Sequence, residues 1–318
     1  MALKVFEAFA GYGGASYGLK KAGIKFKVVG FSEIDKYAAS LYENNHKGAK
    51  NYGDITKIDT DELKDFDLFT GGFPCQPFSN AGKGLGEEDD RGTLFKDIIR
   101  ICSVKRPKYV LLENVKGFAT KRHKPTLNKL IEEFINLGYE ITYKVMNSAE
   151  YGNAQTRQRF WFLAILNPKS DISNYLEIDK LNSSPKFIEF LDKKPDSSLY
   201  LNQDQCKHLI KKHNVDLDVS TSLCLDIYNK KIKYDEVCIT LTEPHHNGLR
   251  VVEPIENNEF RVRKLSINEM FRLMGINEDE INTDGFSYFQ LAKRAANGWD
   301  VIITKKIMSN IFNKYEGK

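Results

Sequence analysis

The chain has 318 residues, with 41% apolar and 28% charged side chains and a formal net charge of +4, from 47 basic against 43 acidic residues. This composition is that of a globular protein of about two domains, and it excludes collagen-like, coiled-coil and wholly disordered chains. The longest uninterrupted apolar run, residues 160–166, is too short to span a membrane as a helix, and residues 1–11 do not resemble a signal peptide. The mild positive charge permits a nucleic-acid partner without requiring one.

Cysteine usage indicates a reducing compartment. The five cysteines, at positions 75, 102, 206, 224 and 238, are odd in number, widely spaced and without a C-x-x-C pair. We therefore expect free thiols and a cytoplasmic protein. Cys206, His208 and His213 are close in the sequence, but no second Cys/His pair follows at zinc-site spacing, so we expect no metal site.

The first half of the chain alternates short apolar, β-rich runs with helical patterns. The apolar runs predict strands, and the periodic segments between them predict helices. Strand followed by helix, repeated this often, is typical of a parallel sheet covered by helices, so the predicted fold class is α/β. The predicted strands are residues 3–9, 26–31, 67–71, 109–112, 139–146 and 159–166, and the predicted helices are residues 14–22, 35–46, 91–104 and 125–137.

The pattern changes after residue 167. Residues 167–261 are polar and irregular and hold five of the nine prolines, which predicts a smaller second domain of short strands and loops. A helix start returns at Ser266, where Glu269 three residues on completes a capping box. A last amphipathic helix is predicted over residues 299–315.

A glycine-rich turn follows the first predicted strand, in the run F-A-G-Y-G-G-A-S-Y-G-L of residues 9–19. Its glycines let the backbone turn sharply and approach a ligand, and the helix behind them offers free N–H groups. A dinucleotide fingerprint requires glycine at position 16, where Ser16 stands, so the run favours a nucleotide-like cofactor other than NAD. Glu33, at the end of the second predicted strand, can take both ribose hydroxyls, and Asp54 is a second acid at a strand end. These two acids disfavour the alternative of a plain strand–helix turn.

Cys75 lies in G-G-F-P-C-Q-P-F-S, residues 71–79, directly after another predicted strand. Ligands bind at the carboxyl ends of strands in such a sheet, and Pro74 and Pro77 stiffen the backbone around the thiol. On spacing alone, a nucleophilic thiolate and an inert buried cysteine are equally compatible with this position. Residues 79–91 are rich in glycine and polar side chains, which is typical of a loop over a site.

Three further groups of charged residues are candidates for the site. Glu113, in E-N-V at the end of a predicted strand, would share the edge of the sheet with Cys75, and a carboxyl buried beside a ligand can retain a proton. In Q-T-R-Q-R, residues 155–159, an extended backbone would direct Arg157 and Arg159 to one side, toward a phosphate or a polarised carbonyl, unless they are a solvated surface pair. Residues 100–124 hold eight Lys and Arg against one acid, which predicts a phosphate-contacting surface.

Together these motifs resemble those of the bacterial DNA cytosine-5 methyltransferases of restriction–modification systems, in the same order over nearly the whole chain. The matching segments are F-A-G-x-G-G, Glu33, G-D-I (53–55), P-C-Q, R-G-T-L-F (91–95), E-N-V, Q-x-R-x-R, R-K-L-S-I-N-E-M-F-R-L-M-G (263–275) and A-N-G-W-D-V (296–301). The resemblance implies a doubly wound, Rossmann-like sheet of the S-adenosylmethionine-dependent methyltransferase class, with a second, smaller target-recognition domain. It also implies S-adenosylmethionine as cofactor, a base flipped from duplex DNA, and a cytoplasmic enzyme of bacterial or phage origin.

The resemblance assigns chemistry to the matching residues. Cys75 would attack C6 of the flipped cytosine and Glu113 would hold N3 protonated, after which C5 would take the methyl group and Cys75 would be eliminated. Arg157 would contact the base O2, and Arg159 would support the loop that carries Cys75. The residues placed in the cofactor site are Phe9, Gly11, Tyr12, Gly13, Gly14, Glu33, Ile34, Asp54, Ile55, Pro74, Leu94 and Asn297.

The expected arrangement is a catalytic, cofactor-binding domain over residues 1–167 and 286–318, with target recognition and a hinge over residues 168–285. Residues 183–261 should choose the DNA sequence, and T-L-T-E-P-H-H-N-G, residues 240–248, is the best candidate for a reading loop because its polar side chains can reach base edges. A polar hairpin turn is the alternative, and residues 220–233 are the next candidate. The residues expected on DNA are Ser79, Arg91, Thr240, Thr242, His245, His246 and Asn247.

Two positions depart from the family pattern. Ile34 stands where tryptophan is frequent, and it offers apolar contact without a stacking face. Ala296 stands where glycine is usual, which requires either a turn with negative φ or a weaker cofactor site. We expect a monomer that acts on double-stranded DNA, with a restriction endonuclease of the same site as a candidate partner. Three alternatives stay open: a transfer-RNA cytosine-5 methyltransferase, a catalytically silent DNA-binding module and an NAD-dependent oxidoreductase.

Overall fold

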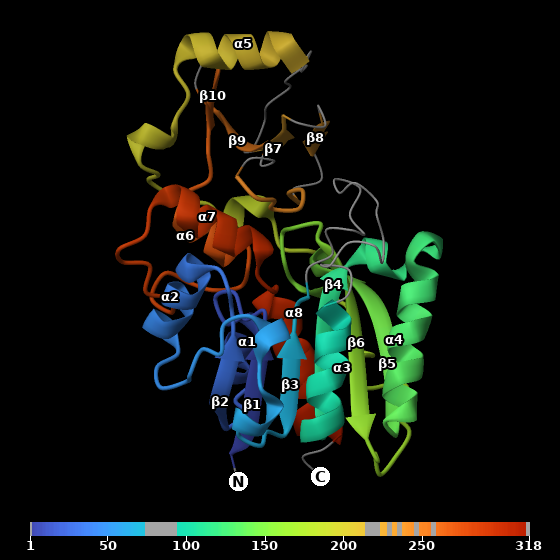
Figure 1. Ribbon diagram of the computed structural model, residues 1–318. Helices are drawn as coiled ribbons and strands as arrows, with labels where there is room; N and C mark the ends of the chain where they lie inside the picture. Colours follow the sequence, from blue (N-terminus) through green and yellow to red (C-terminus); the bar gives the residue numbers. More distant parts are fainter. Residues whose placement is uncertain are drawn as a thin grey trace. The chain divides into compact units, whose positions relative to one another are not determined.

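The computed structural model describes residues 2–73, 94–213, 223–227, 231–233, 237–244, 248–255 and 259–315. The chain divides into two compact units, each with its own sheet (Figure 1). The first unit comprises Met1–Met146, Gln158–Asp179 and Ile303–Lys318, and the second comprises Asn147–Arg157 and Lys180–Ile302. In the described part of the chain no helix is long and apolar enough to cross a bilayer.

The sheet of the first unit has six strands in the order β2-β1-β3-β4-β6-β5. They are β1 (Leu3–Ala8), β2 (Phe26–Ser32), β3 (Leu68–Gly71), β4 (Tyr109–Val115), β5 (Tyr139–Asn147) and β6 (Gln158–Leu166). β1 pairs in parallel with β2 and β3, and β3 with β4. β6 runs antiparallel to β4, so the expectation of a wholly parallel sheet is wrong at this side. Residues 148–157, which join β5 to β6, contain no α-helix that could carry the chain back across the sheet.

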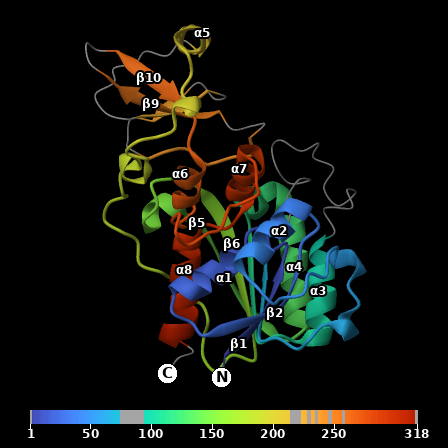
Figure 2. The same cartoon turned by 90° about the vertical axis from the view of Figure 1, so that its left-hand side faces the viewer.

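Helices cover both faces of this sheet (Figure 2). α3 (Leu94–Lys105) and α4 (Lys124–Asn136) lie on one face, and α1 (Gly14–Lys21) and α8 (Val301–Ser309) lie on the other, where Gly18 packs against Thr304. α2 (Lys36–Asn45) begins after Asp35, whose carboxylate accepts the N–H groups of the first turn. α8 continues as a π-helical segment over Asn310–Tyr315. The doubly wound α/β class expected from the sequence is confirmed.

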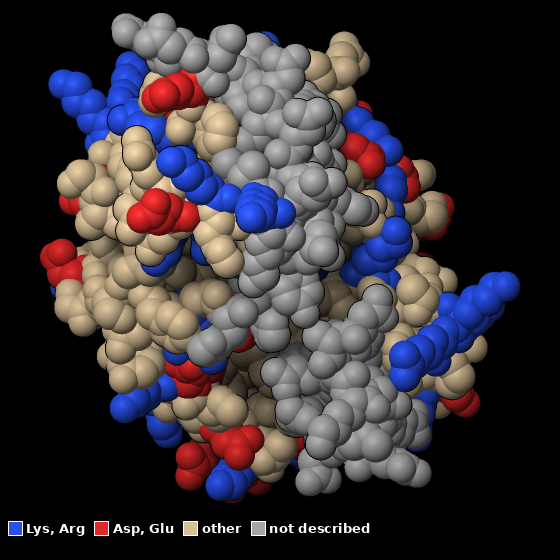
Figure 3. All heavy atoms as spheres, turned by 90° about the horizontal axis from the view of Figure 1, so that it is seen from above, with Lys and Arg blue, Asp and Glu red and all other residues tan. Residues whose placement is uncertain are grey.

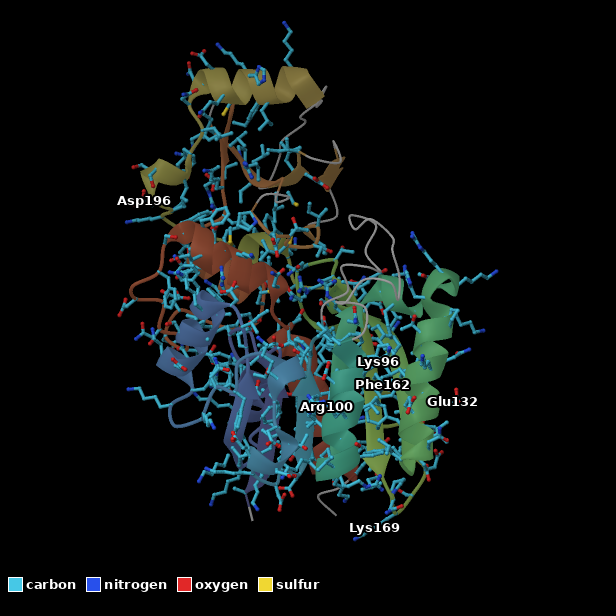
Figure 4. The ribbon with its side chains drawn as sticks, viewed as in Figure 1. Lys96, Arg100, Glu132, Phe162, Lys169 and Asp196 are labelled. Atoms are coloured by element: carbon cyan, nitrogen blue, oxygen red, sulfur yellow. The ribbon has the colours of Figure 1, made fainter. Side chains whose placement is uncertain are left out.

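The apolar core of the first unit lies between the sheet, α3 and α4. Phe160 and Phe162 of β6 contact Phe118 and Phe134, with ring centroids 5.4 Å apart in both pairs, and Figure 4 labels Phe162 in this layer. Each such ring, fully buried, contributes roughly 1.5–3 kcal/mol to folding. Short 3-10 helices interrupt the connections of the chain at Ile55–Lys57, Thr60–Glu62, Lys116–Ala119, Lys121–His123, Ser148–Tyr151, Phe187–Phe190 and Ser197–Leu199.

In the residues that the structure describes, the second unit contains an antiparallel sheet in the order β10-β9-β7-β8 and three α-helices. The strands are β7 (Leu223–Asp226), β8 (Lys231–Lys233), β9 (Leu249–Pro254) and β10 (Phe260–Arg263), and the helices are α5 (Gln203–His213), α6 (Ile267–Arg272) and α7 (Tyr288–Asn297). The capping box predicted at Ser266 and Glu269 is confirmed, and Ser287 with Gln290 forms another at the start of α7.

A buried ion network joins β9, β10 and α6 within the second unit. Arg263 has no exposed side-chain surface; its Nε lies 2.6 Å from Glu253 Oε1, and its two terminal nitrogens each lie 2.8 Å from an oxygen of Glu269. Removing these charges from water is costly, and the fork-shaped pairing with Glu269 offsets that cost only in this one geometry. The network therefore fixes β10 relative to α6.

Candidate active site

Three strands of the first unit end level with one another at one edge of the sheet, and β4 passes the same level at Leu112 before it ends at Val115. Ala8 of β1 is level with Ser32 of β2 and Gly71 of β3, and Gly71 is level with Leu112 of β4. The residues that directly follow these four positions also lie side by side. Across the sheet from β2 to β4 they are Glu33, Phe9, Gly72 and Glu113. With neighbouring strands roughly 4.8 Å apart, the backbones of Glu33 and Glu113 are about 14 Å apart along this edge. The sheet thus brings the two predicted ligand-binding carboxyls to one edge.

The turn after β1 has the left-handed backbone that glycine permits. Gly11 has φ +57° and Gly13 has φ +86°, and Phe9 adopts φ +52° without being glycine. The space beside Gly11 is open, whereas a Cβ at position 13 would meet the ring of His46 at 2.3 Å. The turn therefore needs glycine at position 13 for packing as well as for φ, and it leaves an open face at Gly11.

Glu33 is bonded to this turn. One oxygen of its carboxylate accepts the N–H of Gly11 at 3.0 Å, and the other accepts the N–H of Asp35 at 2.9 Å. Asn51 holds the backbone of Glu33 through two hydrogen bonds of 3.2 and 3.1 Å. Burial raises the pKa of Glu33, while the backbone N–H groups oppose that shift. Since each carboxylate oxygen can accept more than one hydrogen bond, Glu33 retains acceptor capacity for hydroxyl groups of a ligand.

The other residues expected in the cofactor site differ in exposure. Ile34 is 77% exposed beside Glu33, as an apolar contact for a flat ring requires. Asp54 accepts the N–H and the hydroxyl of Thr56, so its carboxylate caps a 3-10 helix. The side chains of Tyr12 and Ile55 are buried in the interior, which leaves only their backbone for ligand contact. Gly14 and Leu94 are the first residues of α1 and α3.

Glu7 of β1 lies beneath the glycine turn and is buried. Its carboxylate accepts the hydroxyl and the backbone N–H of Ser16, and the hydroxyl of Tyr42 at 3.0 Å. Ser16 lies in the first turn of α1, and Gly13 at the N-cap supplies no side chain, so Glu7 is the carboxylate that caps this helix. Burial raises the pKa of Glu7 to about 7 in spite of these hydrogen bonds. An acidic side chain therefore already occupies the helix end that would attract a phosphate.

Glu113 is paired with Arg159 at the end of β4. The Nε of Arg159 lies 2.9 Å from Oε1 of Glu113, and both side chains are largely buried. The neighbouring Asn114 donates its amide N–H to the carbonyl of Phe73 at 3.3 Å. Phe73 is the last described residue before Pro74 and Cys75, so Asn114 fixes the backbone where β3 leads into that segment.

Several expected site residues lie outside the described residues and stay predictions. They are Pro74, Cys75, Ser79, Arg91, His245, His246 and Asn247. Of the expected reading loop, the structure describes residues 240–244 and 248. Thr240 donates its hydroxyl to the carbonyl of Thr156 at 2.6 Å, and the N–H of Leu241 donates to the side chain of Gln155 at 2.9 Å, whereas Thr242 is exposed. The first residues of this loop are thus fastened to the segment that carries Q-T-R-Q-R.

Arg157 has different surroundings from Arg159. It belongs to the second unit and is buried, and its guanidinium donates to the carbonyls of Leu241 at 3.3 Å, Ala296 at 2.9 Å and Gly298 at 2.8 Å. The two arginines therefore have different partners, and a ligand shared by both stays a prediction. Because its terminal nitrogens already serve three carbonyls, the geometry does not favour a contact of Arg157 with a base.

Ala296 lies in the last turn of α7 and does not have positive φ. Of the two expected consequences of this alanine, the turn with negative φ is the one observed. Asn297, the last residue of α7, is exposed and donates its amide N–H to Glu243 at 2.6 Å.

The basic residues of segment 100–124 do not form one surface. Lys105, Arg106 and Lys108 precede β4, whereas Lys116, Lys121, Arg122 and Lys124 follow it, so the seven residues of that strand separate the two groups by roughly 20 Å. Arg100 of α3 donates to the carbonyls of Ile55 and Ile58, both at 2.8 Å (Figure 4). On the face seen in Figure 3, acidic side chains lie among the basic ones. The basic residues therefore do not form the single surface expected, and of the two groups only residues 116–124 lie at the site edge.

A family model decides the class of the protein. Residues 3–313 match the model of the C-5 cytosine-specific DNA methylases. The chain belongs to this family. The activity implied by the motifs, that of a DNA cytosine-5 methyltransferase, is thereby confirmed.

Relatives of this methyltransferase match it along almost its whole length. The Type II methyltransferase M.HaeII of Haemophilus aegyptius is 35% identical over 98% of the chain and 93% of its own length, and M.NgoBI of Neisseria gonorrhoeae is 34% identical over 97% and 94%. Among solved structures, the Dnmt2 methyltransferase of S. pombe has a TM-score of 0.74 at 19% identity, covering 98% of this chain and 99% of its own. A putative DNA modification methyltransferase encoded in an E. coli prophage has a TM-score of 0.71 at 19% identity, covering both chains fully. At these identities the structural likeness shows the fold.

The sequence reading missed three residues that support the site of this methyltransferase. Glu7 was detectable as an acid inside an otherwise apolar strand, and Asn114 as the polar centre of E-N-V. His46 carried no signal. Its ring lies 3.1 Å from the carbonyl of Tyr12 and packs on Tyr42, and burial lowers its pKa to about 4. It therefore supports the glycine turn as a neutral side chain.

Proposed function

We propose that this methyltransferase transfers a methyl group from S-adenosylmethionine to C5 of a cytosine flipped out of a specific site in duplex DNA, through a covalent bond between Cys75 and C6. The observation that carries the proposal is the ion pair of Glu113 with Arg159, at the edge of the sheet where Glu33 and the glycine turn also lie. An acid and a guanidinium held together can bind the N3 and O2 edge of a pyrimidine. At the same edge, the carboxylate of Glu33 can accept the ribose hydroxyls of a nucleoside.

The residues at the glycine turn fit S-adenosylmethionine better than a dinucleotide. Glu33 can accept ribose hydroxyls, the exposed Ile34 can cover an adenine ring, and the backbone at Gly11 is open. The carboxylate of Glu7 at the start of α1 disfavours a pyrophosphate there, which counts against an NAD-dependent oxidoreductase. When bound, S-adenosylmethionine supplies an electrophilic methyl group.

The proposed roles of Cys75 and Glu113 follow from the low reactivity of cytosine. C5 of cytosine is a poor nucleophile, and addition of the Cys75 thiolate to C6 pushes electrons onto the ring. Glu113 would stabilise that charge by a hydrogen bond at N3, so that C5 can accept the methyl group. Water then removes the C5 proton, the electron pair re-forms the C5–C6 double bond, and Cys75 leaves as thiolate. We assign the contact with O2 to Arg159 instead of Arg157, because Arg159 accompanies Glu113 and Arg157 is bound to carbonyls.

The second unit is the proposed reader of the DNA sequence. It carries the described part of the loop at residues 240–248. Its antiparallel sheet holds none of the residues expected in catalysis, although Arg157 lies elsewhere in the same unit. We propose that the protein acts as a monomer in the cytoplasm. Because its relatives are named Type II methyltransferases, a restriction endonuclease that cuts the same site is the expected functional partner.

Labelled S-adenosylmethionine tests the proposal directly. The wild-type protein should label duplex DNA and leave transfer RNA unlabelled, and bisulfite sequencing of the product should give the site. Duplex containing 5-fluorocytosine should trap the protein covalently, because fluorine cannot leave as a proton does. Cys75→Ala should abolish both labelling and trapping, whereas the matched Cys206→Ala, on α5, should retain both. Labelling by Cys75→Ala would reject the covalent mechanism, and labelling of transfer RNA alone would reject the DNA substrate.

A further inference from the structure

The buried carboxyl of Glu7 is a charged group that the proposed chemistry does not use. It accepts hydrogen bonds from two elements, from Ser16 at the start of α1 and from Tyr42 on α2. Neither donor is a cation, and within the described ranges Glu7 has no ion pair, so its charge is stabilised there by hydrogen bonds and by the end of the helix. Its side chain is buried beneath the turn that begins at Phe9, directly after the end of β1.

A charge in this position acts on whatever binds above the turn. Water and salt screen buried charges much less than exposed ones, so the interaction extends over several ångströms. Among the described residues, the titratable side chains around this cluster also include His46, Tyr17 and Lys20. His46 packs on Tyr42 and is neutral above pH 5 because burial lowers its pKa to about 4, whereas Lys20 is an exposed cation beside His46. Because its pKa is raised to about 7, Glu7 is mostly ionised at pH 7.5 and loses its charge as the pH falls below 7.

We propose that Glu7 sets the preference of the cofactor site for the positively charged methyl donor over the product that remains after transfer. The inference rests on the proposed function, in which S-adenosylmethionine is the donor. The donor carries a sulfonium cation, and loss of the methyl group converts the same sulfur into the neutral thioether of S-adenosylhomocysteine. The ionised carboxyl of Glu7 attracts the donor through its sulfonium charge and does not attract the neutral sulfur of the product in this way. Glu7 thus favours exchange of product for fresh donor after each turnover.

Calorimetric dissociation constants for both ligands at pH 7.5 test this assignment. In Glu7→Gln the ratio of product to donor dissociation constants should fall by roughly threefold or more, because donor binding weakens and product binding does not. Glu7→Asp should keep most of the ratio by keeping the charge, and Tyr42→Phe should keep it too. Glu43→Gln, which removes an exposed acid from α2, is the matched control and should leave both constants unchanged. Equal weakening of both ligands in Glu7→Gln would overturn the proposal, since a structural role moves them together.

A second measurement uses the unaltered protein, in case Glu7→Gln does not fold. Between pH 7.5 and 5.5 the α-amino groups of both ligands stay largely protonated, while Glu7, with a pKa of about 7, gains its proton. The donor preference should therefore decline over this range, and a constant ratio would overturn the proposal. If the wild-type protein binds neither ligand, the proposed function itself fails, which is a different outcome.

Discussion

Arg159 reaches Glu113 diagonally across the pair of strands β4 and β6, where Arg159 itself stands opposite Val115. This contact depends on the reversal of β6. Because β6 runs antiparallel to β4, its first residues lie at the carboxyl end of β4, where the parallel strands also end. A parallel β6 would have placed Arg159 at the opposite edge, far from Glu113. The direction of one strand therefore assembles the acid and the guanidinium.

Arg159→Lys should lower the rate of methyl transfer by about tenfold or more while the affinity for S-adenosylmethionine stays unchanged. A lysine keeps the charge but cannot offer the planar fork that holds a carboxylate and a base oxygen together. Single-turnover kinetics on a cognate duplex would measure this loss. Arg106→Lys, at an exposed position before β4 and at the opposite end of that strand from Glu113, is the control and should have wild-type kinetics. A wild-type rate in Arg159→Lys would contradict this prediction, because it would show that a positive charge at position 159 is sufficient for methyl transfer without the guanidinium fork.

Arg157→Lys should act on stability. An ammonium group cannot serve the carbonyls of Leu241, Ala296 and Gly298 at once, and leaving buried carbonyls without donors should lower the free energy of unfolding by roughly 2–4 kcal/mol. Urea denaturation would measure the difference. Full stability combined with loss of catalysis would instead return Arg157 to the base-binding role first expected of it.

His46 should make the protein sensitive to acid. Its pKa is lowered from 6.5 to about 4, so the unfolded chain takes up the proton before the folded one does. The stability that the neutral ring contributes is therefore complete above pH 6.5 and is lost as the pH falls toward 4. His46→Gln should reduce the loss of unfolding free energy between pH 7.5 and 4.5 by roughly 2 kcal/mol. The exposed His208 provides the control substitution. Glu7 has the opposite effect on the pH dependence of stability, because its raised pKa stabilises the folded protein at low pH. This contribution is the same in the variant and the wild type, so it cancels in their comparison.

Ile34→Trp should tighten S-adenosylmethionine binding or leave it unchanged. Ile34 is 77% exposed, so a larger ring can be accommodated without repacking, and an indole adds a stacking surface for adenine. Calorimetry with the wild type as reference would show the change. A loss of affinity greater than tenfold would mean that adenine does not lie on residue 34.

The sequence predicted the parts of the fold whose signal is local. The apolar runs of β1, β2, β4, β5 and β6 start at or next to the expected residues, and the helix starts at Ser266 and Asp35 follow from capping chemistry. The direction of β6 was not predictable, because an apolar run reads the same in both directions. α7 was missed although Ser287 and Gln290 form a capping box, and the strongly polar α5 offers little apolar periodicity.

The candidate site was predictable to the extent that it follows strand ends. Glu33 and Glu113 lie at the expected edge because each directly follows a register-matched residue. The separation of Arg157 from Arg159 was not predictable, since two residues apart in sequence they belong to different compact units. Likewise the support of the glycine turn by His46 depends on how α2 packs, which no short motif encodes.

The division of the chain limits how the second unit, the proposed reader of the DNA sequence, can be exchanged with that of a relative. Residues 147–157 belong to this unit although they precede β6, and three of them hold it together: Arg157 through Leu241 and Gly298, Gln155 through Leu273, and Asn153 through Asp300. A hybrid enzyme made by transplanting residues 180–302 alone would combine the loops of the relative with the native segment 147–157, whose hydrogen bonds hold those loops. New target sequences should therefore be acquired by joint exchange of residues 147–157 and 180–302, or by point changes that leave the hydrogen bonds of residues 147–157 intact.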